Sequence, residues 1–134
     1  MKRSFIIALF LFAVTVKGQQ EDFETFYKRF ISDPEFQLTR VKFPSPVMIL
    51  NLETAGEDTI YVSKDEWEFS NYEIGEPHKI ITYDNFDKHD AGKIRNTNEH
   101  VVSFVGTNNG INYHVYFKMI NGKWYLVKTI DLSA

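Results

Sequence analysis

A short polar stretch, residues 84–92, gathers the side chains of this sequence that are best suited to chemistry. Asp84, Asp87, His89 and Asp90 place three carboxylates and an imidazole within seven residues, a set that can ligate a hard cation. The calcium-loop pattern fails because Asn98, not Glu, stands at the twelfth position from Asp87. A stretch this rich in Asp, Asn and Gly is typical of a solvated turn. We predict no metal site, keep these four residues as weak candidates, and expect no cofactor.

Two further side chains present a choice between a chemical and a structural role. His114 lies near the hydroxyl group of Tyr116 and could support acid–base chemistry, but only inside a water-poor pocket, so a structural or surface histidine is favoured. Arg40 could bind a ligand carboxylate in bidentate geometry, or it could pair with Asp33 or Glu35. We favour the structural pair.

Linear catalytic motifs are missing from the sequence. It contains no Gly-x-Ser-x-Gly, no His-Glu-x-x-His, no phosphate-binding glycine loop and no cysteine nucleophile. This favours a non-catalytic domain that binds a small ligand or a protein partner. The alternative is a small-pocket acid–base enzyme of the isomerase, dehydratase or hydrolase type, since isolated Asp, His or Tyr residues can form a catalytic pocket without a motif.

Residues 99–132 must position most of these candidates, and they predict three antiparallel strands. Asn121-Gly122 lies between apolar-rich runs and supplies the two positive-φ residues of a type I′ hairpin. This turn fixes a register. The predicted partners are Ile120 and Lys123, Met119 and Trp124, Phe117 and Leu126, Val115 and Lys128, and Tyr113 and Ile130.

Asn109-Gly110 is the second turn, and it predicts Phe104 opposite Val115 and Val102 opposite Phe117. Both turns place the apolar residues on one face, because side chains alternate between faces along a strand. Lys128 alone does not fit that core face. The opposite, mixed face is predicted to carry Val101, Ser103, Val105, His114, Tyr116, Lys118, Tyr125, Val127, Thr129 and Asp131.

A fully solvated face would carry more charge than this mixed face does. We therefore expect a part of it to be covered by another element, by a second copy in a homodimer, or by a ligand. An exposed aromatic-rich face with good cross-strand pairs is the alternative. The residues predicted to contact a ligand or partner are Tyr116, Tyr125, His114, Val127 and Arg40.

The chain before the closing strands predicts helices first and strands after. Aromatic and aliphatic residues recur at helical spacing over residues 23–31, and Asp33-Pro34 can cap and start a second, short helix. Residues 40–43 predict an edge strand or a bend, residues 47–62 a hairpin, residues 63–66 a capping box, and residues 79–83 a strand. Helices followed by antiparallel strands indicate an α+β domain.

Residues 1–18 have the basic head, apolar centre and small final residue of a cleavable secretory signal. The apolar run is too short for a membrane span. We expect an exported, periplasmic or secreted domain over residues 19–134, which is not a lipoprotein because the chain lacks cysteine. Removal of three of the fifteen basic residues leaves 12 − 18 = −6 charges, which argues against nucleic acid as a partner.

The sequence also resembles a family of small secreted bacterial proteins of uncharacterised function. The resemblance rests on the segment Phe-Gln-x-x-Arg-x-x-Phe-Pro after an aromatic helix, here Phe36, Gln37, Arg40, Phe43 and Pro44. It implies a nuclear-transport-factor-2-like (cystatin-like) cone, in which N-terminal helices pack on a curved antiparallel sheet that ends in the meander of residues 99–132. It transfers no catalytic or binding residue.

Overall fold

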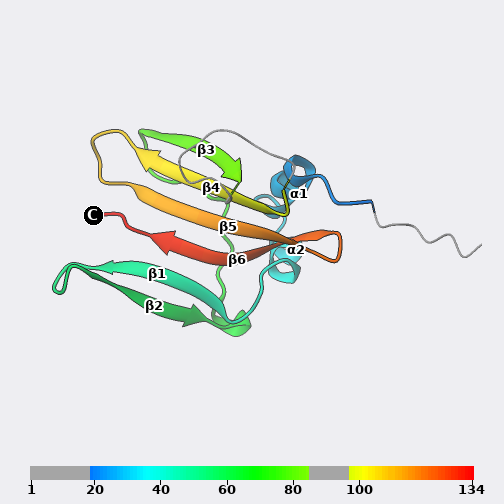
Figure 1. Ribbon diagram of the computed structural model, residues 1–134, viewed down its shortest axis with the longest axis horizontal. Coiled ribbons are helices and arrows are strands. Elements are labelled where there is room, and N and C mark those ends of the chain that lie inside the picture. The colour runs from blue at the N-terminus through cyan, green and yellow to red at the C-terminus, as the bar shows by residue number, and fades with distance from the viewer. Residues whose placement is uncertain (1–18, 85–96) are drawn as a thin grey trace, which may run out of the picture.

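The computed structural model describes residues 19–84 and 97–134, which form one six-stranded sheet with two helices at one end (Figure 1). The strand order is β2-β1-β6-β5-β4-β3. All neighbours are antiparallel except β1 and β6, which run parallel and so depart from the fully antiparallel sheet expected from the sequence. The strands are β1 (Ser45–Asn51), β2 (Gly56–Val62), β3 (His78–Asp84), β4 (Glu99–Gly106), β5 (Asn112–Ile120) and β6 (Lys123–Asp131).

The two helices begin where capping side chains satisfy their first backbone N–H groups. In α1 (Phe23–Phe30) the Asp22 carboxylate accepts a hydrogen bond from the N–H of Thr25 at 3.0 Å. In α2 (Pro34–Thr39) the Asp33 carboxylate accepts from the N–H of Phe36 at 3.1 Å, with Pro34 at the first helical position. Neither helix, nor any other in the described residues, is long and apolar enough to cross a membrane.

The core lies on the face of the sheet that the helices cover. Phe117 is at its centre and makes edge-to-face contacts with rings of α1, including Phe30 at 5.3 Å and Phe26 at 5.7 Å. Trp124 is 2% exposed, and its indole N–H donates to the carbonyl oxygen of Glu21 at 2.8 Å. The side chains of α1 and of the β5–β6 hairpin therefore form one aromatic cluster.

The connection from β2 to β3 must cross the sheet, because these strands lie at opposite edges (Figure 1). It passes over the core face, where Tyr72 is buried and stacks on Phe30 and Phe104. Gln37 of α2 holds this crossing segment from within the core. Its amide group donates to the carbonyl oxygens of Phe30 and Ser70 at 2.9 and 2.7 Å, and it accepts from the N–H of Ser70 and the indole of Trp67 at 3.1 Å.

A bulge in β6 changes the predicted register of the last hairpin. Asn121 and Gly122 have positive φ, and Phe117 pairs with Leu126 as predicted. Beyond that point Tyr116 pairs with Lys128, so Val127 is the extra residue of a β-bulge.

The bulge shifts the rest of β6 by one residue, and the corresponding predictions are wrong. Val115 pairs with Thr129 instead of Lys128, and Tyr113 pairs with Asp131 instead of Ile130. Thr129 is 2% exposed. Thr129 and Asp131 therefore lie on the core face, and not on the mixed face where they were predicted. Lys128, the residue that did not fit the core pattern, is turned to the outer face.

Two further register predictions need correction. Phe104 pairs with Tyr113 and Val102 with Val115, a shift of two residues that keeps both side chains on the core face. The loop between β4 and β5 is longer than a two-residue turn and has positive φ at Asn108 and Gly110. The strand expected over residues 40–43 is reduced to a single parallel bridge between Val41 and Leu126.

His100 is buried in the core beside α1. Its ring stacks on Phe23 at 4.6 Å and meets the edge of Trp124 at 4.7 Å. Burial lowers the pKa of His100 below its usual value, although the Asp84 carboxylate and the backbone of Thr97 act in the opposite direction. The neutral imidazole is the form that this packing accommodates.

Replacing Gln37 by Leu should lower the free energy of unfolding by at least about 2 kcal/mol, because Leu leaves buried backbone groups of Phe30 and Ser70 without partners. Urea unfolding followed by tryptophan fluorescence measures this change. The matched control is Gln20→Leu at an exposed position, where a change within about 0.5 kcal/mol is expected. Equal effects of the two substitutions would contradict the role given to Gln37.

The second prediction concerns pH. The pKa of His100 is lower in the folded chain than its unfolded value near 6.5, so the unfolded chain binds more protons as the pH falls. The stabilisation is complete above about pH 6.5 and is lost as the pH falls through the folded pKa. Urea unfolding between about pH 7.5 and about pH 5.5 should show this loss, and His100→Phe should reduce its slope. Identical slopes for the two proteins would refute it.

Candidate functional site

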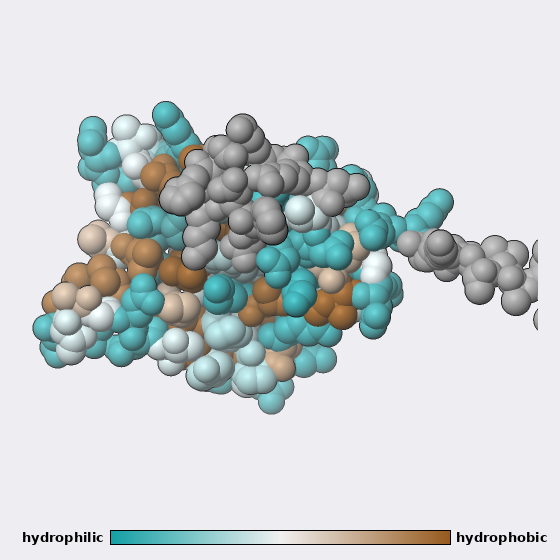
Figure 2. Space-filling model, viewed as in Figure 1, coloured by the Kyte–Doolittle hydropathy of each residue, from teal (hydrophilic) through white to brown (hydrophobic). Residues whose placement is uncertain are grey.

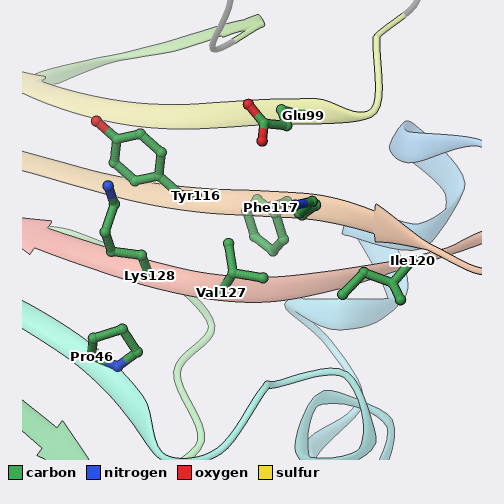
Figure 3. Close-up of a pocket in the computed structure, with 8 residues that line it drawn as sticks. Pro46, Glu99, Tyr116, Phe117, Ile120, Val127 and Lys128 are labelled. Carbon is green, nitrogen blue, oxygen red and sulfur yellow. The ribbon is translucent and has the colours of Figure 1, made fainter.

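A depression of about 490 Å³ lies on the outer face of the sheet, opposite the helices. We call it the outer depression (Figure 3). Its wall and floor are contributed by four neighbouring strands, β1, β6, β5 and β4. The outward side chains that line it are Pro46, Glu99, Tyr116, Lys118, Ile120, Val127 and Lys128.

The bulge at Val127 shapes this depression. A bulge inserts an unpaired residue, bends its strand and re-aims the neighbouring side chains. Val127 and Lys128 both line the depression, although alternation in a regular strand would send consecutive side chains to opposite faces. Phe117, beside the bulge on β5, keeps its ring in the core behind the sheet (Figure 3).

Charged and aromatic groups are interleaved at this site. The Lys128 ammonium lies 4.3 Å from the centre of the Tyr116 ring, and Figure 3 shows Lys128 reaching from β6 toward that ring. Glu99 and Lys118 are direct cross-strand partners. Burial raises the pKa of Tyr116, with nearby Tyr83 acting in the same direction, so its hydroxyl group stays protonated and can donate a hydrogen bond.

His114 is on the outer face but does not line the depression. It pairs with Ser103 and Ile130, whereas the register predicted from the two Asn-Gly turns implies Val105 and Thr129 as its partners. Its Nδ1 lies 2.6 Å from the Ser103 hydroxyl group, and its Nε2 contacts the side-chain oxygen of Asn112. These contacts fit an Nε2–H donor and an Nδ1 acceptor, the neutral form, and burial lowers the pKa of His114 in agreement. Both ring nitrogens are thus used within the fold.

Arg40 has a structural partner, but not the one predicted. It forms a bidentate pair with Glu21 at 2.6 and 2.9 Å, whereas Asp33 lies 3.6 Å from Arg29 instead. Burial raises the pKa of Glu21, but the hydrogen bonds from Arg40 and from the N–H of Trp124 outweigh it and hold that pKa below its usual value. The pair fixes the start of α1 against the β5–β6 hairpin.

Tyr125 lies next to the depression, not in its lining. The Lys42 ammonium sits 4.1 Å from the centre of its ring. Lys118 is the cross-strand partner of Tyr125, so the same alternation of lysine and tyrosine that occurs at Tyr116 and Lys128 is repeated here. Of the five residues predicted to contact a ligand, Tyr116 and Val127 come together in the depression and Tyr125 borders it.

Asp84 is the only weak cation candidate within the described residues, since Asp87, His89 and Asp90 lie outside them. It is 2% exposed and pairs across the strands with buried His100. In the described part of the chain no group of three or more His, Cys, Asp or Glu side chains is placed to hold a metal ion.

Asp84 and His100 are a buried carboxylate and imidazole, the kinds of group that acid–base catalysis uses. A groove of about 410 Å³ runs between α1 and β3 and is lined by Phe23, Tyr27 and Thr82, among others. Neither Asp84 nor His100 lines it, and Phe23 stacks on both the His100 and the Tyr27 ring. Burial raises the pKa of Tyr27 to about 12. Tyr27 lines this groove, whereas Asp84 and His100 are buried outside its lining.

The sequence missed most of the depression. Pro46 and Lys128 were not predicted, because their positions depend on the parallel pairing of β1 with β6 and on the bulge. Glu99 and Ile120 were not predicted as site residues either, although alternation along β4 and β5 places both on the outer face. One signal was present: Lys128 was the single residue that broke the core pattern, and a bulge is the device that turns such a residue outward.

Comparisons with solved structures agree with the fold. An NTF2-like protein from Bacteroides fragilis aligns with a TM-score of 0.63 at 19% identity over 88% of this chain and 50% of its own, so this chain spans about half its length. A cystatin-like protein from Bacteroides caccae aligns with a TM-score of 0.53 at 27% identity over 83% and 76%. A protein from Bacteroides uniformis gives 0.54 at 22% over 84% and 77%. No curated protein matches the sequence.

A family model matches residues 21–132, which is nearly all of the described domain. The match covers the two helices, the crossing segment and all six strands. The structural relatives supply the fold name that goes with it. The chain therefore belongs to an uncharacterised family of Bacteroides-type proteins with an NTF2-like fold.

Proposed function

We propose that this protein is an exported, non-catalytic domain that binds a small ligand or a protein partner in the outer depression. The observation that carries the proposal is the bulge at Val127, which turns Val127 and Lys128 to one face and opens a depression around Tyr116. Such bulges are enriched next to functional sites because they re-aim side chains. A depression with apolar, aromatic and charged lining groups has the composition of a binding site.

The chemistry of the described residues supports binding more than catalysis. His114 uses both ring nitrogens within the fold, Arg40 is paired with Glu21, and His100 is packed between rings. In the depression itself, Tyr116 and Lys128 present donors and Val127 an apolar surface. These groups can hold and orient a ligand, and the lining also contains the Glu99 carboxylate, which lies opposite Lys118 across the strands.

Export supports a role outside the cytoplasm and follows from the basic and apolar head of the sequence, which lies outside the described residues. Protein recovered from the envelope or culture medium of its native host should begin at residue 19. Intact mass and N-terminal sequencing measure this. A chain retained in the cytoplasm with Met1 still present would contradict export.

The binding proposal predicts a specific pattern of ligand-induced changes. The mature protein, labelled with ¹⁵N, is titrated with a mixed set of sugars, amino acids and short peptides. Amide shifts should cluster at Tyr116, Lys118, Val127 and Lys128, because these residues line the depression. Tyr116→Ala should abolish the shifts.

The control is Phe69→Ala, which removes an aromatic ring that is 41% exposed on the segment crossing the opposite face of the sheet, and should leave the shifts unchanged. Shifts centred on the groove of Tyr27 and Thr82 would overturn the proposed site. So would shifts that survive Tyr116→Ala.

A further inference from the structure

We infer that the partner of the outer depression is an acidic, extended polypeptide segment with carboxylates at alternate positions. This inference rests on the proposed binding function and names the chemistry of the ligand. It comes from three lysines on the outer face, Lys42, Lys118 and Lys128, each placed beside a tyrosine ring. Figure 2 views this face and shows hydrophilic side chains next to hydrophobic ones outside the area that grey atoms cover.

Two of the three lysines, Lys42 and Lys128, are held over tyrosine rings. The ammonium groups of Lys42 and Lys128 lie 4.1 and 4.3 Å from the ring centres of Tyr125 and Tyr116. A cation over a ring keeps its N–H donors for another acceptor. The ion pairs between described side chains join Arg29 to Asp33 and Arg40 to Glu21, and Lys118 has the Glu99 carboxylate as its cross-strand neighbour.

The spacing of the lysines matches an extended chain. Lys118 of β5 pairs with Tyr125 of β6. Lys128 of β6 pairs with Tyr116, which lies two residues before Lys118 on β5. Such diagonal neighbours on adjacent strands are about 7–8 Å apart. Alternate side chains of an extended peptide are about 6.6–6.8 Å apart on one side. Carboxylates at positions i and i+2 therefore reach both lysines, and the intervening side chains point away or meet the apolar lining.

The three lysines lie on a domain that is otherwise acidic. The mature chain carries a formal charge of −6, and residues 51–77 contain eight acidic side chains but one lysine. The three lysines thus form a local cationic surface on an acidic domain. A long polyanion such as nucleic acid would be repelled by the rest of the molecule, whereas a short acidic segment that reaches only this surface would not.

The lining distinguishes a peptide from a carbohydrate. Sugar rings bind proteins by stacking on open aromatic faces, but lysines lie over the rings of Tyr116 and Tyr125. Pro46, Ile120 and Val127 add an apolar surface. Acidic groups that alternate with apolar side chains complement both properties. A homodimer formed by two copies of this face would set the same lysines against each other, which disfavours a second copy as the occupant.

The test uses the mature protein and three labelled peptides of about ten residues, in which Val alternates with Glu, Gln or Lys. Fluorescence anisotropy measures binding. The Glu peptide should bind, the Gln peptide should bind at least about tenfold more weakly, and the Lys peptide should not bind. Raising the salt concentration from about 0.05 to about 0.5 M should weaken binding of the Glu peptide.

Charge reversal locates the site. The double variant Lys118→Glu with Lys128→Glu should weaken binding of the Glu peptide by at least about tenfold and strengthen binding of the Lys peptide. The control is Lys64→Glu, a lysine in the exposed turn after β2, which should change neither. Circular dichroism and urea unfolding confirm that both variants remain folded.

Other results separate this inference from the proposed function. Equal binding of the Glu and Gln peptides, abolished by Tyr116→Ala, would refute an acidic partner and leave the binding site standing. Lysine-dependent binding of a carboxylated or sulfated oligosaccharide without peptide binding would also refute it, as would self-association of the chain through Lys118 and Lys128 in sedimentation. Ligand binding that neither Tyr116→Ala nor the charge reversal affects would overturn both proposals.

Discussion

One buried side chain, Gln37, supplies the hydrogen-bond partners that the segment crossing the core face needs. The sheet places β2 and β3 at opposite edges, so the chain between them must cross the core face, where its backbone groups would lose water. Gln37 is fully buried and supplies two donors and two acceptor contacts to Phe30, Trp67 and Ser70. It thereby fixes the crossing segment to both helices, and Tyr72 can pack against the sheet. Every hydrogen-bonding group of its amide is used, which makes a buried polar residue compatible with an aromatic core.

The pair of Arg40 and Glu21 ties the end of α2 and the start of α1 to the β5–β6 hairpin. The guanidinium binds both oxygens of Glu21 and lies 4.7 Å from the Phe36 ring, while Glu21 also accepts from the backbone of Trp124. Together with Gln37 this explains the segment from Phe36 to Pro44 that connects the chain with its family. Phe36 and Phe43 are packing residues, Phe43 meeting Trp67 edge-on at 5.7 Å, and the polar members are internal ties. The described residues of this segment thus hold the fold together, and the residues of the proposed binding site lie elsewhere.

The helices and the crossing segment cover one face of the sheet, and the proposed binding site lies on the other. The bulge in β6 provides a break in the regular alternation there, and it costs the sheet one paired residue, Val127. In return a lysine that would be unfavourable in the core becomes part of a surface of lysines and tyrosines. The stabilising and the proposed binding parts of the molecule therefore share strands β5 and β6 but use opposite faces.

The sequence alone determined the α+β class, the two capped helices, the Asn121-Gly122 turn and the aromatic core residues, because these depend on local capping, turn chemistry and side-chain periodicity. It also placed Tyr116 and Val127 on the outer face. Only the tertiary structure decided the partner of Arg40, the parallel pairing of β1 with β6, the four contacts of Gln37 and the depression around the bulge. These features join residues that are far apart in the chain, and a single inserted residue at Val127 changes which side chains meet without changing any local pattern before it.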